Sequence, residues 1–139
     1  MLVLRGPREG GGNSTEQEMF GAAAVLPHRI ANNEGGEKAI LEVVLLGVPS
    51  KHRGKGGATL LLRFLHDICR TNQIDQMFLF ARSIEIGLLE MYEGKGFRRA
   101  SMGEKEAIRP IFTLDYDERD GNFVPPYPVH LLVKDTELP

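Results

Sequence analysis

The residues with the clearest chemical potential form a glycine-rich basic turn. Residues 53–58 are Arg-Gly-Lys-Gly-Gly-Ala, and Lys51 lies two residues earlier. The turn follows an apolar run and precedes an apolar helical pattern. It therefore brings the first backbone N–H groups of a helix close to several cations. Because the helix dipole adds partial positive charge at the same end, this pattern predicts an anion site, most typically for phosphate.

Two common phosphate loops do not fit this turn. A nucleotide-binding P-loop needs Ser or Thr after its Gly-Lys pair, but Gly56 follows Gly54-Lys55 here. The dinucleotide fingerprint needs a third glycine where Thr59 stands. On these residues alone, a basic turn without a ligand remains an alternative. A nucleotide-binding protein that uses the same turn is another, disfavoured by the missing hydroxyl.

The elements around the turn alternate between strand and helix patterns. Asn32–Gly36 (NNEGG) predicts a hairpin turn, because Asn and Gly tolerate positive φ. The order predicts a single α/β domain over residues 1–139 with a mixed sheet. The expected strands are Leu2–Arg5, Met19–Ile30, Lys38–Val48, Gln76–Ala81, Ile108–Leu114 and Val129–Val133, with a further extended segment from Phe97. The expected helices are Gly56–Thr71 and Ile84–Glu93, the second capped by Ser83.

Composition limits the classes of protein that this chain can represent. It has 139 residues, 42% hydrophobic, and a net charge of −2, so a broad basic face for nucleic acid is not expected. No apolar run is long enough to cross a membrane, and no spacing of His, Cys and Asp suggests a metal site. The single cysteine, Cys69, is expected to be buried as a small hydrophobe. We expect a reducing compartment, cytoplasmic or nuclear.

The run V-P-S-K-H-R-G-K-G-G-A-T-L-L resembles the acyl-CoA loop of the GNAT superfamily of N-acetyltransferases. That family's motif is Gln/Arg-x-x-Gly-x-Gly/Ala, and it can be aligned here in two ways. Lys51-x-x-Gly54-x-Gly56 keeps both glycines but has Lys at the first position. Arg53-x-x-Gly56-x-Ala58 matches every residue type of the motif but starts two residues later. We prefer the first alignment, because Arg-Gly-x-Gly is common in the family.

A second block is similar to the family's helix-to-strand motif, Leu-Tyr-x-x-x-Gly-Phe. It is Leu88–Phe97, LLEMYEGKGF, in which Tyr92 stands four residues before Gly96-Phe97. The resemblance covers roughly Ala39–Arg98. It implies a GNAT-like mixed, mostly antiparallel twisted sheet with flanking helices. Two ordered motifs at a compatible spacing are more specific than either alone.

The resemblance also implies a cofactor, acetyl-CoA, and no metal. Pantetheine would enter a gap between two splayed strands and pair with the backbone, and Gly47 would mark a bulge there. The pyrophosphate would bind N–H groups of about Arg53–Ala58. The implied cofactor-binding residues are Leu46, Gly47, Val48, Lys51, His52, Arg53, Gly54, Lys55, Gly56, Gly57 and Ala58.

Two residues are candidates for proton transfer during direct attack of an amine on the thioester. Glu42, six residues before Val48, matches the strand glutamate that the histone-acetyltransferase branch uses as general base. Tyr92 is the candidate general acid for the leaving thiolate. The alternatives are a solvent-facing Glu42 and a Tyr92 that only packs. We expect His52 on the surface, and His28 shows no partner spacing.

The resemblance implies an acetyl-CoA-dependent N-acetyltransferase acting on a primary amine, with protein lysine slightly favoured over a small amine. The alternative is a non-catalytic acyl-CoA-binding regulatory module. The family's N-terminal helices are reduced or missing, so a partner chain supplies them or the chain is a fragment. An uncovered sheet edge would allow a homodimer. The acidic residues Asp115, Asp117, Glu118 and Asp120 form either a solvated loop or a rim for a cationic acceptor.

Overall fold

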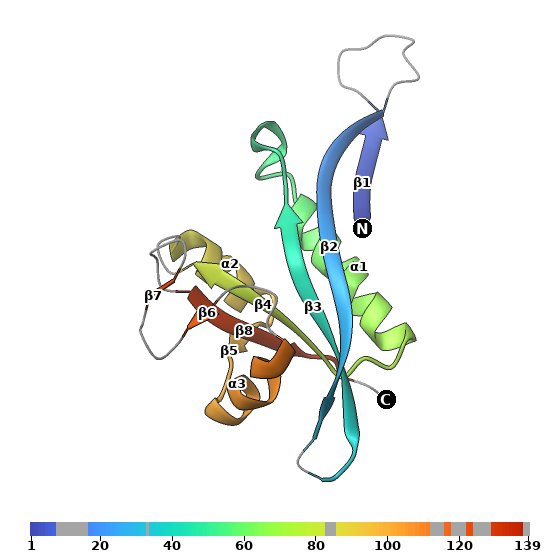
Figure 1. Cartoon of the computed structure of the whole chain (residues 1–139). Coiled ribbons are helices and arrows are strands. Elements are labelled where there is room, and N and C mark those ends of the chain that lie inside the picture. Colours follow the sequence, from blue (N-terminus) through green and yellow to red (C-terminus); the bar gives the residue numbers. More distant parts are fainter. Residues whose placement is uncertain are drawn as a thin grey trace.

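The computed structural model describes residues 1–7, 17–32, 34–82, 86–111, 116–117, 122–123 and 129–137. A six-stranded sheet has the order β1-β2-β3-β4-β8-β5, and two short strands pair separately (Figure 1). The strands are β1 Leu2–Pro7, β2 Gln17–Ala31, β3 Glu37–Gly47, β4 Gln76–Arg82, β5 Arg98–Arg99, β6 Tyr116–Asp117, β7 Asn122–Phe123 and β8 Val129–Asp135. The helices are η1 Ser50–His52, α1 Gly57–Thr71, α2 Ile86–Gly94, α3 Met102–Ile108 and η2 Arg109–Ile111.

The predicted hairpin between β2 and β3 is confirmed. The side-chain Oδ1 of Asn32 accepts the backbone N–H groups of Glu34 and Gly36, at 3.1 and 2.8 Å. Gly35 has a φ of +82°, which a glycine adopts without steric cost. This side-chain capped turn sets the register in which His28 lies opposite Ile40.

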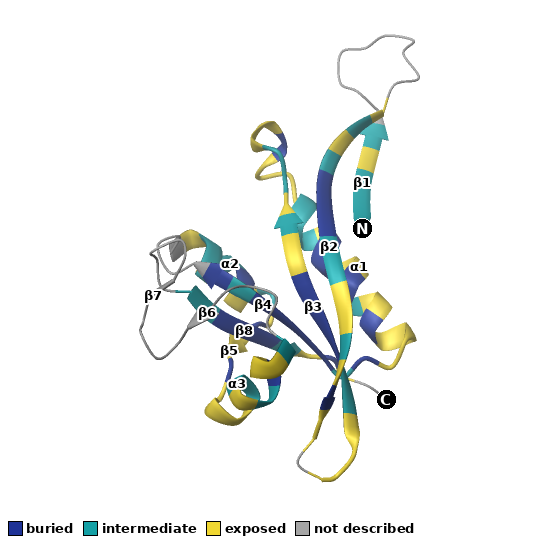
Figure 2. Cartoon of the chain, in the orientation of Figure 1, coloured by how far each residue is buried: buried dark blue, intermediate teal, exposed yellow. Residues whose placement is uncertain are grey.

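The middle of β3 is covered on both faces of the sheet, as its continuous apolar run predicted. Leu41 and Val43 belong to a core with α1 and α2, whereas Ile40 packs with Phe78 and with Ile108 of α3. Figure 2 shows the buried middle of β3 giving way to exposed residues towards its end. Side chains on the two faces of this strand therefore meet different environments.

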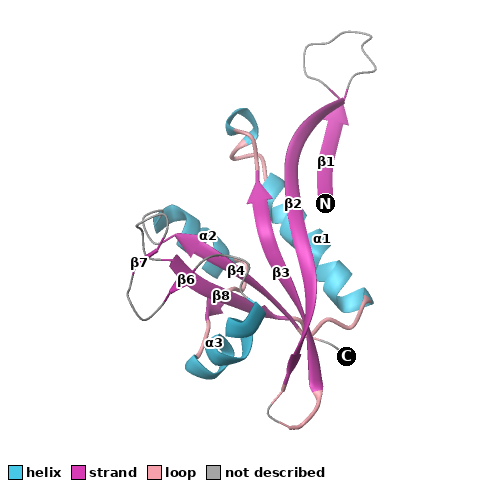
Figure 3. Ribbon diagram, viewed as in Figure 1, coloured by secondary structure: helices cyan, strands magenta, loops and turns pink. Residues whose placement is uncertain are grey.

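The strands β3 and β4 pair over only three residues and then diverge (Figure 3). Their parallel ladder joins Ile40–Glu42 to Gln76–Phe78. β4 then pairs along its whole length with β8, while β3 stays with β2. Val44 is 51% exposed and is the extra residue of a bulge opposite Ala24 and Val25. The bulge predicted at Gly47 is therefore misplaced, because Gly47 pairs regularly with Ala22 at the end of the strand.

The predicted strand Ile108–Leu114 is wrong over its described part. Ile108 ends α3, and η2 follows it. A capping box begins α3, because the Ser101 hydroxyl accepts the N–H of Glu104 and the Glu104 carboxylate accepts the N–H of Ser101. The Ser-x-x-Glu signal for this helix was present in the sequence. Ser83, most of the acidic residues at 115–120 and the rest of this predicted strand lie outside the described residues.

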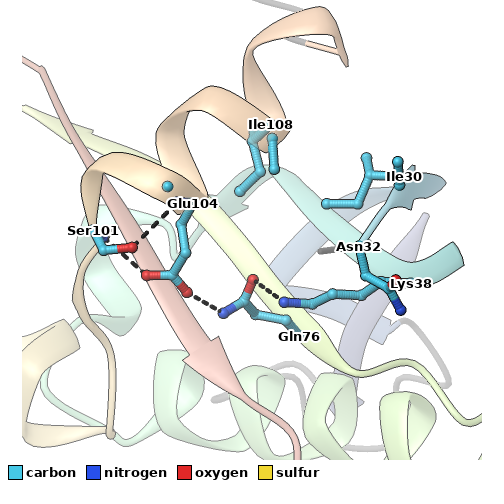
Figure 4. Close-up of a pocket in the computed structure, with 10 residues that line it drawn as sticks. Ile30, Asn32, Lys38, Gln76, Ser101, Glu104 and Ile108 are labelled. Atoms are coloured by element: carbon cyan, nitrogen blue, oxygen red, sulfur yellow. Dashed lines mark hydrogen bonds between the residues drawn. The ribbon is translucent and has the colours of Figure 1, made fainter. Parts of the chain in front are cut away.

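A polar network holds α3 against the sheet, beside a cavity of about 170 Å³ (Figure 4). The buried Gln76 donates from Nε2 to Glu104 at 2.7 Å and to Asp135 at 2.9 Å. Its Oε1 accepts from Lys38 at 3.2 Å, and Arg98 donates two hydrogen bonds to Glu104 at 2.6 and 2.9 Å. These polar groups satisfy one another, so the network is accounted for by packing.

The network makes stability depend on pH. Hydrogen bonds from Arg98 lower the pKa of Glu104 to about 2 from 4.5. A lowered pKa adds stability that is complete above 4.5 and is lost as the pH falls towards 2. We expect the free energy of unfolding to fall more steeply across this range in the wild type than in Glu104→Gln. Urea unfolding at several pH values measures this, with Glu106→Gln on the same helix as the control. Equal slopes for wild type and Glu104→Gln would contradict it.

Candidate functional site

Two adjoining cavities occupy the wedge where β3 and β4 separate. Their volumes are about 290 and about 560 Å³, and they share Leu46, Leu88 and Tyr92 as walls. The first is also lined by Val43, Val44, Leu45, Leu79 and Phe80, and the second by Gly47, Val48, Arg53, Ala58, Gly87 and Met91. Within the described residues, β3 has no strand partner on this side after Glu42, so its backbone borders the wedge.

The basic turn closes the wider end of the wedge. Gly54 and Gly56 have φ values of +81° and +82°, which explains why glycines stand there. Gly56 is the N-cap of α1 and has no side chain to cap the first N–H groups of the helix. Nothing lies within 4 Å of the position that a Cβ would take at Gly47, Gly54 or Gly56. The backbone at these glycines therefore borders open space, and the anion site predicted for the turn stays a prediction.

Two of the predicted backbone donors are engaged within the turn. The N–H of His52 bonds to the Pro49 carbonyl at 2.8 Å, and that of Arg53 bonds to the Ser50 carbonyl at 3.3 Å. The set of N–H groups that can bind an anion therefore begins after Arg53. It continues into the first turn of α1.

The side chains of the turn point to different places. Lys51 forms an ion pair with Glu18 of β2. His52 is only 2% exposed, with its ring centroid 4.2 Å from that of Phe20, so the expectation of a surface histidine is wrong. The Nε of Arg53 donates to the Val48 carbonyl at 3.3 Å, and this residue lines the wedge.

The arrangement bears on the two alignments of the motif. Arg53 and Ala58, the first and last residues of the second alignment, both line the wedge. Lys51, which begins the first alignment, does not line it and contacts β2 instead. Gly54 and Gly56, the two glycines of the first alignment, are both left-handed, and the alignment preferred from the sequence stays a prediction.

Tyr92 is fixed by the way in which α2 ends. The N–H of Phe97 bonds to the carbonyl of Tyr92 and that of Gly96 to the carbonyl of Glu93, each at 3.1 Å. This is the Schellman pattern, with Gly96 at the left-handed position with φ +92°. The rings of Tyr92 and Phe97 meet edge to face at 5.5 Å, the apolar contact that accompanies this ending. The Tyr-x-x-x-Gly-Phe spacing thus places the Tyr92 ring at the wedge.

Glu42 is buried, 2% exposed, and so is not the solvent-facing residue of the alternative interpretation. Its Oε1 lies 2.9 Å from Nε2 of His28 on β2. Side chains alternate along β3, so Glu42 faces the α3 side of the sheet, and Tyr92 packs on the other side. Sequence reasoning missed the His28 partner. Counting outwards from Glu34 at the hairpin would have placed His28 across from Ile40, next to Glu42.

The remaining candidates carry no chemistry that we can assign. Burial raises the pKa of the Cys69 thiol to about 11, which suits the inert hydrophobe that was predicted. Among the described residues, no cluster of three or more His, Cys, Asp or Glu side chains could hold a metal ion. In that same part of the chain, no helix has the length and hydrophobicity needed to cross a membrane.

Solved structures share this fold at low sequence identity. Arabidopsis thaliana Naa50, solved with the bisubstrate analogue CoA-Ac-MVNAL, has a TM-score of 0.58 and 19% identity over 84% of this chain and 66% of its own. A GNAT family acetyltransferase from Elizabethkingia anophelis, solved with acetyl-CoA bound, has a TM-score of 0.57 and 15% identity over 85% and 69%. The chain has the GNAT acetyltransferase fold. Tetrahymena GCN5 has a TM-score of 0.61 and 15% identity over 89% and 64%.

The predicted GNAT-like, mixed and mostly antiparallel sheet with flanking helices is therefore confirmed. This chain spans about two thirds of the length of those GNAT structures. Within its described residues, the first helical segment is η1, after β3. A comparison of the sequence with protein-family models gave no match, and a search of curated proteins gave none.

Two glycines at the end of α2 allow a matched test of the Tyr92 geometry. Gly96→Ala should destabilise the fold by about 1–2 kcal/mol, because an L side chain is strained at its left-handed φ. Gly94→Ala, inside the helix and with nothing within 4 Å of its Cβ position, should stabilise it by about 0.5–1 kcal/mol. Chemical denaturation measures both. If the two variants changed stability in the same direction, the proposed helix ending would be wrong.

Proposed function

We propose that this chain is an acetyl-CoA-dependent N-acetyltransferase that acetylates a primary amine. One observation carries the proposal: the wedge between β3 and β4 joins an open strand backbone, the uncapped N-terminus of α1 and Tyr92. These three features are what an extended ligand with amides, a pyrophosphate and a reactive sulfur needs. The Elizabethkingia anophelis structure, with acetyl-CoA bound, supports the choice of ligand.

Different residues along the wedge would bind different parts of acetyl-CoA. The backbone of Leu46–Val48 would pair with the pantetheine amides, since the end of β3 and Val48 border the cavity on the side where β4 no longer pairs with β3. The N–H groups from Gly54 to Ala58 would hold the pyrophosphate, with Arg53 as the nearest lining cation. Lys55 adds a second positive charge to the same turn. The open space at Gly54 and Gly56 fits close approach of phosphate oxygens to the backbone.

The catalytic roles follow from the two faces of the sheet. When bound, acetyl-CoA supplies an activated acyl group as a thioester. Glu42 would accept the proton of the attacking amine, and His28 would hold its carboxylate through the 2.9 Å contact. Tyr92 would protonate the departing thiolate from the other face. With the acid and the base on opposite faces, the amine and the thioester would meet in the gap between the strands.

The acceptor is proposed to be a protein lysine in preference to a small amine. Glu42 is the residue that resembles the base of the histone-acetyltransferase branch. Leu26 lies directly opposite Glu42 in the β2–β3 ladder and is 43% exposed. A lysine side chain with a long apolar stem could lie over Leu26 while its amine reaches the carboxylate.

Binding of acetyl-CoA is the first test. At a concentration 100 times its Kd, acetyl-CoA should stabilise the fold by about 2.7 kcal/mol, which raises the melting temperature by roughly 5–15 °C. Calorimetry measures both the shift and the heat of binding. Transfer to peptide and small-amine acceptors is then followed by release of free thiol. If calorimetry detected no heat of binding and no shift in the melting temperature, the proposal would be excluded. Binding without transfer to any acceptor would leave the non-catalytic acyl-CoA-binding module.

Substitution of Glu42 tests its role as the base. Glu42→Gln keeps the shape of the side chain and should lower kcat about 100-fold or more, while the Kd for acetyl-CoA stays unchanged. Steady-state rates at saturating acetyl-CoA measure this. Glu37→Gln, an exposed residue of the same strand, is the control and should retain the wild-type rate. A Glu42→Gln enzyme with wild-type kcat would remove this residue from the mechanism.

A further inference from the structure

Two residues near the start of β2 hold two consecutive residues of the basic turn. The ammonium of Lys51 contacts Oε1 of Glu18, and Nε2 of His52 lies 3.3 Å from the same oxygen. Two residues further along β2, the Phe20 ring lies against the His52 ring at 4.2 Å. Glu18 and Phe20 point to the same face of β2, because side chains alternate along a strand. The turn is thus anchored to β2, whose Glu18 lies 33 residues before Lys51 in the sequence.

The charges at this contact favour an ion pair, which Lys51 makes from a largely exposed position. The hydrogen bond from Lys51 is the main cause of a lowered pKa for Glu18, and His52 adds to the effect. Glu18 therefore stays ionised at neutral pH. The His52 ring is buried against Phe20, and beyond the 3.3 Å contact of Nε2 with Glu18 it has no hydrogen-bond partner within the described residues, so it anchors the turn mainly by packing.

The direction of Lys51 separates it from the other basic residues of the turn. Its side chain extends to β2, whereas Arg53 lines the wedge together with Gly47, Val48 and Ala58. Although Lys51 and Arg53 lie only two residues apart, their side chains thus contact different parts of the protein. One holds the turn in place, and the other faces the cavity that the turn closes.

We propose that Glu18 and Lys51 form a clasp that positions the anion-binding turn, and that Lys51 is a positioning residue for the cofactor, not a phosphate ligand. The inference rests on the proposed function in its identification of the ligand as acetyl-CoA. The clasp itself is a property of the free protein. It can therefore be tested with and without that ligand.

Removing the charge of Glu18 distinguishes the clasp from direct phosphate binding by Lys51. Were Lys51 a phosphate ligand, Glu18→Gln would release it and remove a nearby negative charge, so acetyl-CoA would bind more tightly. With a clasp, the same substitution loosens the turn, and the Kd for acetyl-CoA rises roughly fivefold. For Glu18→Gln, direct phosphate binding by Lys51 thus predicts a lower Kd for acetyl-CoA, and the clasp predicts a higher one.

The binding experiment compares four variants by isothermal titration with acetyl-CoA. Glu18→Gln and Lys51→Met should each raise the Kd roughly fivefold, and the double variant should be no worse than either alone, since both remove one contact. Exchanging the charges, with Glu18→Lys and Lys51→Glu together, should restore affinity. If residue 51 contacted the phosphates directly, the glutamate placed there by Lys51→Glu would instead repel them and weaken acetyl-CoA binding further. For Glu18→Gln, the effect should be on Kd and KM, while kcat at saturating acetyl-CoA stays at the wild-type value.

Amide hydrogen exchange of the free protein tests the clasp without any ligand. Glu18→Gln and Lys51→Met should speed exchange across residues 50–58, and the charge exchange should slow it again. Glu37→Gln breaks the exposed Arg29–Glu37 pair at the far end of these strands and should change nothing in the turn. Tighter acetyl-CoA binding by Glu18→Gln, or unchanged exchange at 50–58 in both single variants, would overturn the clasp. If the wild type bound no acetyl-CoA, the proposed function would fail, and the exchange data would still decide on the clasp.

Discussion

The parting of β3 and β4 after a three-residue ladder is the constraint on which the rest of this structure depends. After that ladder β4 stays paired with β8 along its whole length and β3 stays paired with β2, so the sheet divides into two parts. The separation exposes backbone of β3 that no described strand satisfies on that side. These backbone groups can therefore pair with a ligand that has amides of its own.

The elements at the rim of the gap are held by specific backbone conformations and side-chain contacts. The left-handed glycines of the turn set the start of α1, the Schellman ending of α2 sets the Tyr92 ring, and an ion pair to β2 holds Lys51. On the opposite side of the sheet, the buried Gln76 ties α3 to β4 and β8. The gap is therefore bordered by fixed structure, which is what a site for an extended ligand requires.

The features that the sequence predicted correctly depend on local chemistry. The hairpin at Asn32–Gly36 and the glycine turn both follow from the positive φ that glycine tolerates. The features it missed depend on contacts between distant segments. The burial of His52 and the direction of Lys51 are set by β2, and the His28–Glu42 pair follows from the hairpin register. The α3 helix was missed, although Ser101 and Glu104 carried the capping signal, and only its last residue, Ile108, fell in a predicted strand.

The central claim is that the wedge binds acetyl-CoA along β3 and at the start of α1. Amide chemical shifts of ¹⁵N-labelled protein, followed during a titration with acetyl-CoA, test it most directly. We expect the largest changes in Leu46–Val48 and in Gly54–Ala58. Changes confined to the cavity beside α3, near Lys38 and Ser101, or no changes at these two segments at saturation, would contradict the claim.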